Sequence, residues 1–579
     1  MILMVFHSLR PNISGSYQAR INEALPSGAI RLSLESDQKK TVSKRTISKR
    51  KVRSIRLGTL EMEVEKGYDG AGKSLINPEV RELVADGMNF AYDTIWEVTR
   101  LRYLENMQRE QIRQRMPFPI SSGAVSNLYT EGIAYISLLI ESRESELKSY
   151  YLKDDRPFVL QIDGTNEGGK STVYTVRDAF TGNVLHACKI RSENQPDLEE
   201  ILRLIEQRFR KPDAVVSDMS APTLAAVRDL WNETVPSHIC QFHFLRDLGN
   251  DLLKVHHEKM RSEIKKSLVS GELNQIRARM EKHVREGETE IHKNVYSEAI
   301  NMVDWIKDYK TELTGQGTPF DLALKNYYER CVTMKKQVDK ILKKKKRKVV
   351  KSALELIQRR LKRIERQPLS RAYRALKKDA LLFERIRAIF VLPEDSRYAP
   401  LSNNQTSDAP SKIQQVKIDE ILVELKTLDA KEKSFAKSMD RKRYEKVITQ
   451  LEKYRNKLDN TIEFNGKPFY LPRTNNLCET GFRAFKRDLR QMSGKKNLRQ
   501  ILDSIPAEVL YLQNLKDPNF HQILFGDLPE YLAFTSIDRK QVREKLKAIR
   551  ALPTKKVELT RIRKKDFLES SLIYMKKPA

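Results

Sequence analysis

The stretch FVLQID at residues 158–163 decides the fold, because an apolar run that ends in an acid indicates a buried strand whose last side chain is a carboxylate. A second run, AVVS at residues 214–217, is followed by Asp218. A third acid, Glu479, stands at the head of a helical pattern in the stretch TNNLCE at residues 474–479. Three carboxylates brought to one point would repel one another unless a hard divalent cation neutralised them. The pattern therefore makes these three acids candidate metal ligands.

The residues around the first two acids predict alternating strands and helices. Strands are expected at 158–163, 172–177 and 184–190, and a helix follows in which apolar residues recur at helical spacing from Leu198 to Phe209. The remaining elements are the strand before Asp218, a helix through Trp231, a strand at 238–242 and a helix from about residue 245. The order β-β-β-α-β-α-β-α, with acids ending the first and fourth strands, is the layout of a ribonuclease-H-like core.

A long insertion must separate Asp218 from Glu479, because the two acids are 261 residues apart. The charged, mostly helical pattern at 259–465 is the candidate for it. The predicted fold class is therefore an α+β, α-rich multidomain chain in which a ribonuclease-H-like α/β core is interrupted by a large all-helical insertion. The predicted parts are a basic N-terminal segment (1–65), a helical, helix-turn-helix-like DNA-binding domain (66–150), the first part of the core (151–258), the insertion (259–465), the second part of the core (466–525) and a basic C-terminal tail (526–579).

The charge of the chain indicates a polyanionic partner. Its 579 residues contain 107 Lys and Arg against 77 Asp and Glu, a net charge of +30, and nucleic acid is the usual partner of a protein this basic. No membrane partner is expected, since no stretch approaches the roughly 18 apolar residues of a membrane span. We also expect no signal peptide. The four cysteines are scattered and suggest no disulfide framework, so a reducing compartment is expected.

A helix-turn-helix-like element is expected within the helical region from about residue 78 to 150. A helix at 109–116 is followed by a proline-containing turn and by a second, serine-capped helix. On the exposed face of that second helix, Ser122, Ser126 and Asn127 are candidate DNA-binding residues in the major groove. An ordinary helical hairpin is the alternative. Residues 1–65 are weakly patterned apart from a strand-like stretch at 54–64.

The helix that begins near Glu479 carries further candidate DNA-binding residues. Arg483, Lys486 and Arg490 follow Glu479 at spacings of 4, 3 and 4, which places all four on one helical face. A metal-binding acid continued by three cations suits a helix that lies along a phosphodiester backbone. The alternative is that Asn476 and Glu479 form a capping box, which would explain the glutamate without catalysis. The two roles can coexist.

Three other features have competing interpretations. Cys240 and His243 could form half of a zinc site with His256 and His257, but the ligand count favours a buried pair that packs or orients the catalytic strand. Trp305 could stack on an extruded base, although a core position is the favoured interpretation. The basic run at 343–348 could be a solvated helix face, a DNA-backbone contact or a nuclear import signal.

Taken together, the three acids, the stretch CQFHFLR at residues 240–246 and the stretch TNNLCE resemble the DDE transposases that carry a C/D-x-x-H signature. This group includes Mutator-like and hAT-type elements and related bacterial insertion-sequence transposases. The resemblance covers about 156–258 and 466–500. The sequence departs from many eukaryotic relatives because it has no obvious N-terminal zinc finger.

The resemblance implies that Asp163, Asp218 and Glu479 form a catalytic triad that binds two Mg²⁺ or Mn²⁺ ions, with Cys240 and His243 supporting the site. It also implies DNA as the partner, an all-helical insertion before the glutamate and end-specific DNA binding by the N-terminal region. Two transposon ends must be paired, so a dimer or larger oligomer is expected. The expected location is the cytoplasm or nucleoid of a bacterium, or the nucleus in a eukaryote.

The resulting function hypothesis is a DNA transposase that cuts at transposon ends and joins the freed 3′-hydroxyl to target DNA. The alternative is a catalytically silent, domesticated DNA-binding protein with the same fold. A basic structural protein of RNA assemblies is a more distant alternative, because it leaves the three acids unexplained.

Overall fold

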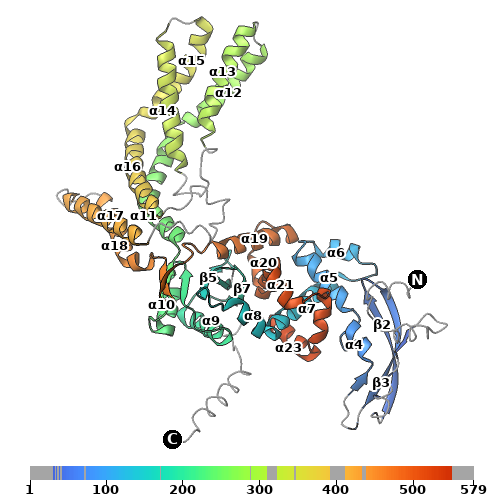
Figure 1. Cartoon of the computed structure of the whole chain (residues 1–579). Helices are drawn as coiled ribbons and strands as arrows, with labels where there is room; N and C mark the ends of the chain where they lie inside the picture. Colours follow the sequence, from blue (N-terminus) through green and yellow to red (C-terminus); the bar gives the residue numbers. More distant parts are fainter. Residues whose placement is uncertain are drawn as a thin grey trace, which may run out of the picture. The chain divides into compact units, whose positions relative to one another are not determined.

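A computed structural model describes most of the chain (Figure 1). The described residues are 30–32, 34, 38, 42, 44–68, 70, 74–169, 171–286, 289–309, 322–344, 347–390, 411–432 and 439–550. They form two compact units. Unit 1 comprises Met1–Val215, Ala225–Val235 and Leu477–Ala579, and unit 2 comprises Val216–Leu224 and Pro236–Asn476.

The central five-stranded sheet confirms the predicted order of elements. Its strands follow the order β7-β6-β5-β8-β9, and β5, β6 and β7 form an antiparallel meander. Every residue of β6 is buried, so both faces of the sheet are covered there. The elements in chain order are β5 (Val159–Thr165), β6 (Thr172–Asp178), β7 (Val184–Ile190), α9 (Gln195–Arg208), β8 (Ala214–Ser217), α10 (Ala221–Trp231), β9 (Ser237–Ile239) and α11 (Gln241–Ser267). The chain is thus α+β and mostly helical, and its assignment to the ribonuclease-H-like fold stays a prediction.

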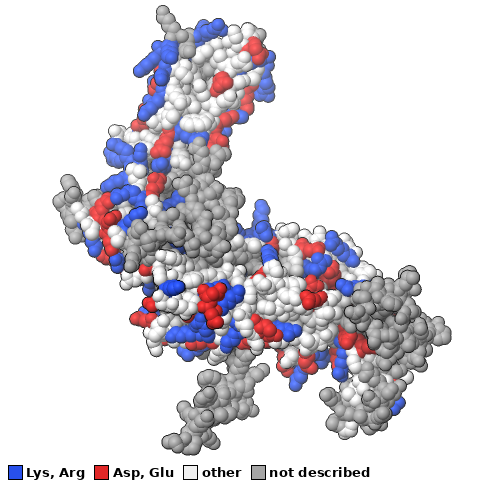
Figure 2. Space-filling model, in the orientation of Figure 1, with Lys and Arg blue, Asp and Glu red and all other residues white. Residues whose placement is uncertain are grey.

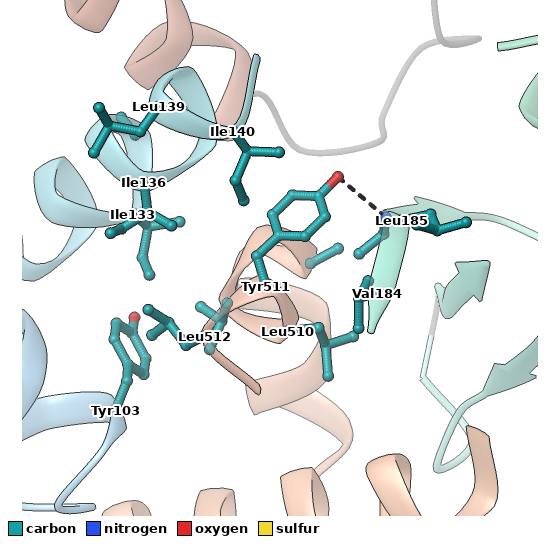
Figure 3. Close-up of a cluster of buried hydrophobic side chains, with 14 of the residues drawn as sticks. Tyr103, Ile133, Ile136, Leu139, Ile140, Val184, Leu185, Leu510, Tyr511 and Leu512 are labelled. Carbon is teal, nitrogen blue, oxygen red and sulfur yellow. Dashed lines mark hydrogen bonds between the residues drawn. The ribbon is translucent and has the colours of Figure 1, made fainter. Parts of the chain in front are cut away.

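The core of unit 1 joins segments far apart in the sequence. Figure 3 shows side chains of α7 (Ser122–Ser142) meeting those of β7 and of the 3₁₀ helix η3 (Ala507–Lys516) in one buried cluster. The Ala187 backbone N–H donates a 3.4 Å hydrogen bond to the Tyr511 hydroxyl within this cluster. The helices α5 (Tyr92–Tyr103), α8 (Glu144–Tyr151) and α21 (Pro518–Phe525) contribute to the same core.

The N-terminal region differs from the expectation of a weakly patterned segment with one short strand at 54–64. It contains β1 (Ile30–Leu32), β2 (Lys44–Ser54), β3 (Gly58–Tyr68) and β4 (Ser74–Ile76), with β2 and β3 paired along eleven residues each. Ion pairs between the two strands explain why a basic stretch forms a strand: cations of β2 lie opposite acids of β3, as in Lys49–Glu63 (3.4 Å) and Lys51–Glu61 (3.2 Å). Residues 1–29 lie outside the described residues.

The C-terminal region also differs from expectation, because residues 530–550 are folded rather than a tail. The helices α22 (Glu530–Ala533) and α23 (Arg539–Arg550) belong to unit 1, and Val542 is fully buried. Cations of α23 hold it against α7: Arg539 pairs with Glu131, and Lys545 pairs with Glu141 at 2.8 Å. The high charge of this stretch arises from contacts within the protein as well as from exposed residues. Residues 551–579 lie outside the described residues.

Unit 2 is built mainly from helices around its own core. They are α11, α12 (Val269–Glu286), α13 (Glu290–Lys307), α14 (Ala323–Leu342), α15 (Lys348–Leu361), α16 (Gln367–Phe390), α17 (Ser411–Glu432) and α18 (Met439–Tyr454). The predicted polar linker at 403–411 lies outside the described residues except for Ser411, which begins α17.

The expectation of an all-helical insertion as far as residue 465 was wrong at its end. An antiparallel hairpin of β10 (Thr461–Phe464) and β11 (Lys467–Tyr470) occurs there. Its two-residue turn, Asn465–Gly466, has positive φ at both positions, which is the geometry that Asn-Gly hairpin turns favour. No described helix is long and apolar enough to cross a membrane.

Candidate active site

The helix that carries Glu479 is α19 (Asn476–Ser493). Its first residue is assigned to unit 2 and the remainder to unit 1. Phe482, Phe485 and Leu489 form its buried, apolar face. Glu479 lies in the first turn and is half-buried. The helix begins at Asn476, three residues before Glu479, so the capping-box alternative stays open beside the catalytic one.

The candidate Asp163 lies on β5, the middle strand of the sheet. It pairs with Thr175 of β6 in the antiparallel register. Its side chain is half-buried, and one carboxylate oxygen accepts a 2.8 Å hydrogen bond from the Gly164 backbone N–H. The pairing with β6 therefore fixes the backbone of this acid, while its carboxylate keeps access to solvent.

A buried thiol lies close to both acids of unit 1. Cys478 is 0 % exposed. Burial raises the pKa of the Cys478 thiol well above its usual range; the positive charge of Arg177 opposes this, and the charges of Asp163 and Glu479 raise the pKa further. Glu479 adjoins Cys478 in the chain, whereas Asp163 is 315 residues away from it in the sequence. We call Asp163, Thr175, Arg177, Cys478 and Glu479 the β5–α19 cluster.

The buried guanidinium of Arg177 ties this cluster together. Its Nη1 donates to the Gly182 carbonyl at 2.8 Å, and its Nη2 donates to the Gln513 side chain at 2.6 Å. Gln513 in turn donates to the Gly481 carbonyl at 3.0 Å. A Cβ at Gly481 would lie 2.4 Å from Nη2 of Arg177, so only glycine leaves room for the guanidinium under the first turn of α19. Burial lowers the pKa of Arg177, and the charges of Cys478 and Asp163 oppose this.

The three candidate cations of α19 differ in their surroundings. Arg483 is exposed. Lys486 and Arg490 both pair with Glu167, which lies four residues after Asp163, at 3.5 Å and 2.7 Å. Lys486 also donates to the Asn166 carbonyl at 3.2 Å. Two of the three cations thus brace α19 against the segment that follows β5, and their role as phosphate ligands stays a prediction.

The third candidate acid, Asp218, lies in unit 2 directly after β8. Its side chain is half-buried and accepts a 3.0 Å hydrogen bond from the Ser220 backbone N–H, just before α10 begins. This local turn holds the carboxylate at the end of the strand, as the sequence predicts.

The residues Cys240 and His243 lie near Asp218 within unit 2. The Cys240 backbone N–H donates to the carbonyl of Ser217 at 2.7 Å, and the Cys240 thiol accepts a 3.2 Å hydrogen bond from the Asn475 backbone N–H. Cys240 thus connects the residue before Asp218 to a residue four positions before Glu479. His243 is buried on α11.

An acid that sequence reasoning missed, Asp247, lies one helical turn after His243. Burial raises the pKa of Asp247; the nearby charges of Arg246 and His243 oppose this, and those of Asp251 and Asp218 raise it further. The spacing of four between His243 and Asp247 on one helix is a signal that could have identified it. We call Asp218, Ser220, Cys240, His243 and Asp247 the β8–α11 cluster. Arg177 and Glu167 were also missed, because their roles depend on contacts between distant segments.

The chemistry of the candidate acids fits a divalent metal, but no complete ligand set is gathered. Partly exposed carboxylates are the oxygen donors that Mg²⁺ and Mn²⁺ take. Across the described residues, however, no group of three His, Cys, Asp or Glu is arranged to hold a metal ion. Asp163 and Glu479 belong to unit 1, and Asp218 belongs to unit 2.

The zinc alternative for Cys240 and His243 receives no support from the second histidine pair. His256 lies 3.3 Å from the buried Asp379. His257 is buried, and this burial lowers its pKa. The hydrogen bonds of Cys240 to backbone groups instead support a packing role.

The helix-turn-helix-like candidates lie at the N-terminal end of α7, which follows α6 (Arg109–Arg115). Ser122 is exposed. The Ser126 hydroxyl hydrogen-bonds to that of Tyr129 at 2.9 Å, and Asn127 accepts a 3.0 Å hydrogen bond from Arg550 of α23. Beyond its first turns α7 is a core helix, so only its first turns offer a surface to DNA.

The expectation that Trp305 is a core residue was wrong. Its side chain is 39 % exposed on α13. The guanidinium of Arg330 lies 4.7 Å from the centre of its ring, which is a cation–π arrangement. The amphipathic spacing of α13 misled the prediction because it places Trp305 at the edge of the apolar face.

Comparison with known proteins adds little. No protein-family model matches the chain, and no curated protein matches it. Among solved structures it is similar to a chain described as "Drosophila P element transposase strand transfer complex", with 13 % identity and a TM-score of 0.31, over 77 % of this chain and 94 % of the other. A likeness at this TM-score carries no argument, so the function rests on the residues described above.

Proposed function

We propose that the chain is a DNA transposase of the DDE type, with Asp163, Asp218 and Glu479 as its catalytic, metal-binding acids. The observation that carries the proposal is that α19, which bears Glu479, packs against the strands beside Asp163. A Cβ at Gly481 would lie 2.4 Å from Nη2 of Arg177 on β6, and Lys486 donates to the carbonyl of Asn166, three residues after Asp163, at 3.2 Å.

The β8–α11 cluster supports the third acid. Asp218 follows the residue whose carbonyl binds the Cys240 backbone N–H, and the Cys240 thiol binds the segment that leads into α19. We infer that Asp218 completes the ligand set when the enzyme is loaded with metal. His243 and Asp247 would orient the start of α11 beside it.

The proposed reaction divides its tasks between the metal and the chain. Two bound Mg²⁺ or Mn²⁺ ions would supply activation of the attacking water or 3′-hydroxyl and stabilisation of the leaving oxygen. The three carboxylates would hold the ions and aim them at one phosphodiester. Arg177 would keep the backbones of Asp163 and Glu479 in place through its hydrogen bonds to Gly182 and Gln513.

The partner proposed for this site is DNA. The net charge of +30 would draw the chain to a polyanion, and the exposed Arg483 and the first turn of α7 would contact it. Pairing of two DNA ends would require a dimer or a larger oligomer. The proposed location is wherever the DNA of the host lies.

The test is metal-dependent nicking of a labelled duplex that carries the terminal repeat flanking the reading frame. Asp163→Asn and Glu479→Gln should each reduce nicking by about 100-fold or more, because lost charge stabilisation of several kcal/mol corresponds to factors of ten per 1.4 kcal/mol. Asp488→Asn is the matched control, since Asp488 lies on α19 and pairs with its neighbour Arg487. Its nicking rate should equal that of the wild type.

A catalytically silent DNA-binding protein is the second candidate. The observation that favours it is that the described residues hold no group of three possible metal ligands. Under this alternative the wild type binds the same duplex but does not nick it with Mg²⁺ or with Mn²⁺. That result would overturn the proposed enzyme.

A further inference from the structure

The positive charge of the chain is concentrated in one part of unit 2. Residues 323–390, which include α14, α15 and α16, contain 23 Lys and Arg against six Asp and Glu, a net charge of +17. The neighbouring helices α12 and α13, at residues 269–307, contain six Lys and Arg against seven Asp and Glu, a net charge of −1. In Figure 2, basic side chains follow the edge where Figure 1 places α15 and α16.

The cations of α15 and of the 3₁₀ helix η1 (Lys362–Glu365), which directly follows it, fall into two sets with different surroundings. Arg360 and Arg363 pair with Glu272 of α12, at 3.3 Å and 2.7 Å, and so hold the two helices together. Four other cations form what we call the α15 stripe: Lys348, Lys351, Arg359 and Lys362. All four are exposed, and no ion pair of the described residues involves any of them.

The α15 stripe is straight and one-sided. At about 3.6 residues per turn its members lie within about 80° of one another around the helix axis, and they extend over about 21 Å at a rise of about 1.5 Å per residue. Glu355 is the acid on this face. The opposite face is apolar, with Ala353, Leu354, Ile357 and Leu361 buried in the core of unit 2.

We propose that the α15 stripe binds the phosphodiester backbone of double-stranded DNA. This rests on the proposed function for the identity of the polyanion and assigns a second DNA contact to unit 2. A row of exposed cations interrupted by one acid, Glu355, follows the regular charge of a duplex and would release its counterions. Residues 348–366 contain no aromatic side chain on which the bases of a single strand could stack.

A membrane surface fits the α15 stripe less well than DNA does. A helix that lies on a bilayer inserts an apolar face beside its cations. The apolar face of α15 is already buried against its own unit. Only the charged side remains for a partner, and phosphate contacts alone can supply the binding.

The test uses the full chain with the substitutions Lys348→Gln, Lys351→Gln, Arg359→Gln and Lys362→Gln together. Binding to a labelled duplex of arbitrary sequence is measured against salt concentration. If four phosphate contacts are lost, the slope of log K against log salt should become shallower by about 3.6. Between about 50 and about 200 mM salt, the affinity of the wild type should therefore fall about 100-fold more than the affinity of the variant. Unchanged circular dichroism would show that the variant is folded.

The matched control removes four other cations of unit 2: Lys265→Gln, Lys266→Gln, Arg279→Gln and Lys282→Gln. The net charge changes equally, but Lys266 pairs with Glu263 and Lys282 with Glu286, on α11 and α12, whose net charges are only +2 and +1. Its salt slope should match that of the wild type. Equal slopes for the stripe variant and the control would overturn the proposal, whether both are lowered or both unchanged.

Two further arms separate other outcomes. An equal loss of slope on a single strand of the same sequence, or on vesicles with anionic lipid, would contradict the assignment to duplex DNA. The proposed enzyme fails separately. If the stripe variant shows the expected slope while the wild type never nicks DNA, the α15 stripe stands and the transposase proposal falls.

Discussion

The β5–α19 cluster and the β8–α11 cluster hold their acids by different means. In unit 1, Asp163 and Glu479 come from segments 316 residues apart. The buried Arg177 of β6 reaches Gly182 and Gln513, and Gln513 donates to the Gly481 carbonyl of α19, two residues after Glu479. In unit 2, Asp218 is held by the backbone of its own turn, through Ser220. The first arrangement depends on long-range packing, whereas the second forms wherever the strand ends.

This difference indicates which substitutions should destabilise the candidate site most. In the β5–α19 cluster, a substitution of Arg177 removes contacts between distant segments, which the local hydrogen bond from Gly164 to Asp163 does not replace. In the β8–α11 cluster, a substitution of Cys240 leaves the hydrogen bond from Ser220 to Asp218 intact and weakens only the connection to the segment before α19. Stability effects should therefore be larger in unit 1 than in unit 2.

The largest effect is expected from Arg177→Ala. Removing a buried guanidinium leaves the Gln513 and Gly182 acceptors without their donor and should lower the free energy of unfolding by about 3 kcal/mol. Chemical denaturation, with hydrogen exchange of β6 and α19 amides, measures the loss. Arg228→Ala, at an exposed position paired with its neighbour Asp229, is the control and should show no measurable change. An equal response in both variants would contradict the bracing role of Arg177.

A second test places a side chain under α19. Gly481→Val should lower the free energy of unfolding by about 1–3 kcal/mol, because its Cβ would meet the Arg177 guanidinium. Part of this loss should disappear when Arg177→Ala is present, since the two sites contact each other. Gly271→Ala on α12 is the control: nothing lies within 4 Å of its Cβ, and replacing a helical glycine there should stabilise slightly. If the losses in unfolding free energy from Gly481→Val and Arg177→Ala were strictly additive, the two residues would not contact each other.

A smaller effect is expected in unit 2 from Cys240→Ala. The Asn475 backbone N–H would lose its thiol acceptor, at a cost of about 1 kcal/mol. Hydrogen exchange at Asn475 should rise, while the amide of Ser220, bound to Asp218, should be unaffected. Equal exposure of both amides would mean that Cys240 supports the Asp218 turn directly.

The smallest effect at neutral pH concerns a histidine whose contribution grows as the pH falls. Burial, followed by the charges of Arg208 and Lys545, lowers the pKa of His186 on β7 from 6.5 to about 3. Below pH 6.5 His186 binds a proton in the unfolded chain, whereas in the folded chain it stays neutral until about pH 3. The stability of the fold should therefore fall as the pH falls from 6.5 to about 3. The melting temperature of His186→Gln should vary less between these limits, whereas the exposed His283→Gln should follow the wild type. If the melting temperature of His186→Gln varied with pH as that of the wild type does, His186 would not be the cause of the loss of stability at low pH.

Local periodicity explains what could be predicted from the sequence. The strands and helices from β5 to α11 follow apolar spacing, and so does the buried face of α19 at Phe482, Phe485 and Leu489. The N-terminal β2 could not be found in this way, since cations rather than apolar residues alternate along it and pair with acids of β3. The Asn465–Gly466 turn did carry a signal, but the charged helical pattern around it hid the hairpin.

The parts of the site that escaped prediction depend on tertiary contacts. Arg177 is separated by 336 residues from Gln513, and nothing in its own neighbourhood marks it as a buried brace. The pairing of Glu167 with Lys486 and Arg490 also links distant segments. The charge pattern of α19 suggested DNA contacts, and the residues of α23 were predicted to be part of a basic tail, yet several cations of both helices hold segments together within unit 1.

The central proposal is that Asp163, Asp218 and Glu479 bind the same pair of metal ions. Replacing Mg²⁺ by Fe²⁺ and generating hydroxyl radicals with ascorbate and peroxide would cut the backbone near the bound metal. The account predicts fragments from cuts near residues 163, 218 and 479 together, all of them lost in Asp163→Asn. Cuts near 163 and 479 without cuts near 218, or a pattern unchanged in Asp163→Asn, would contradict it.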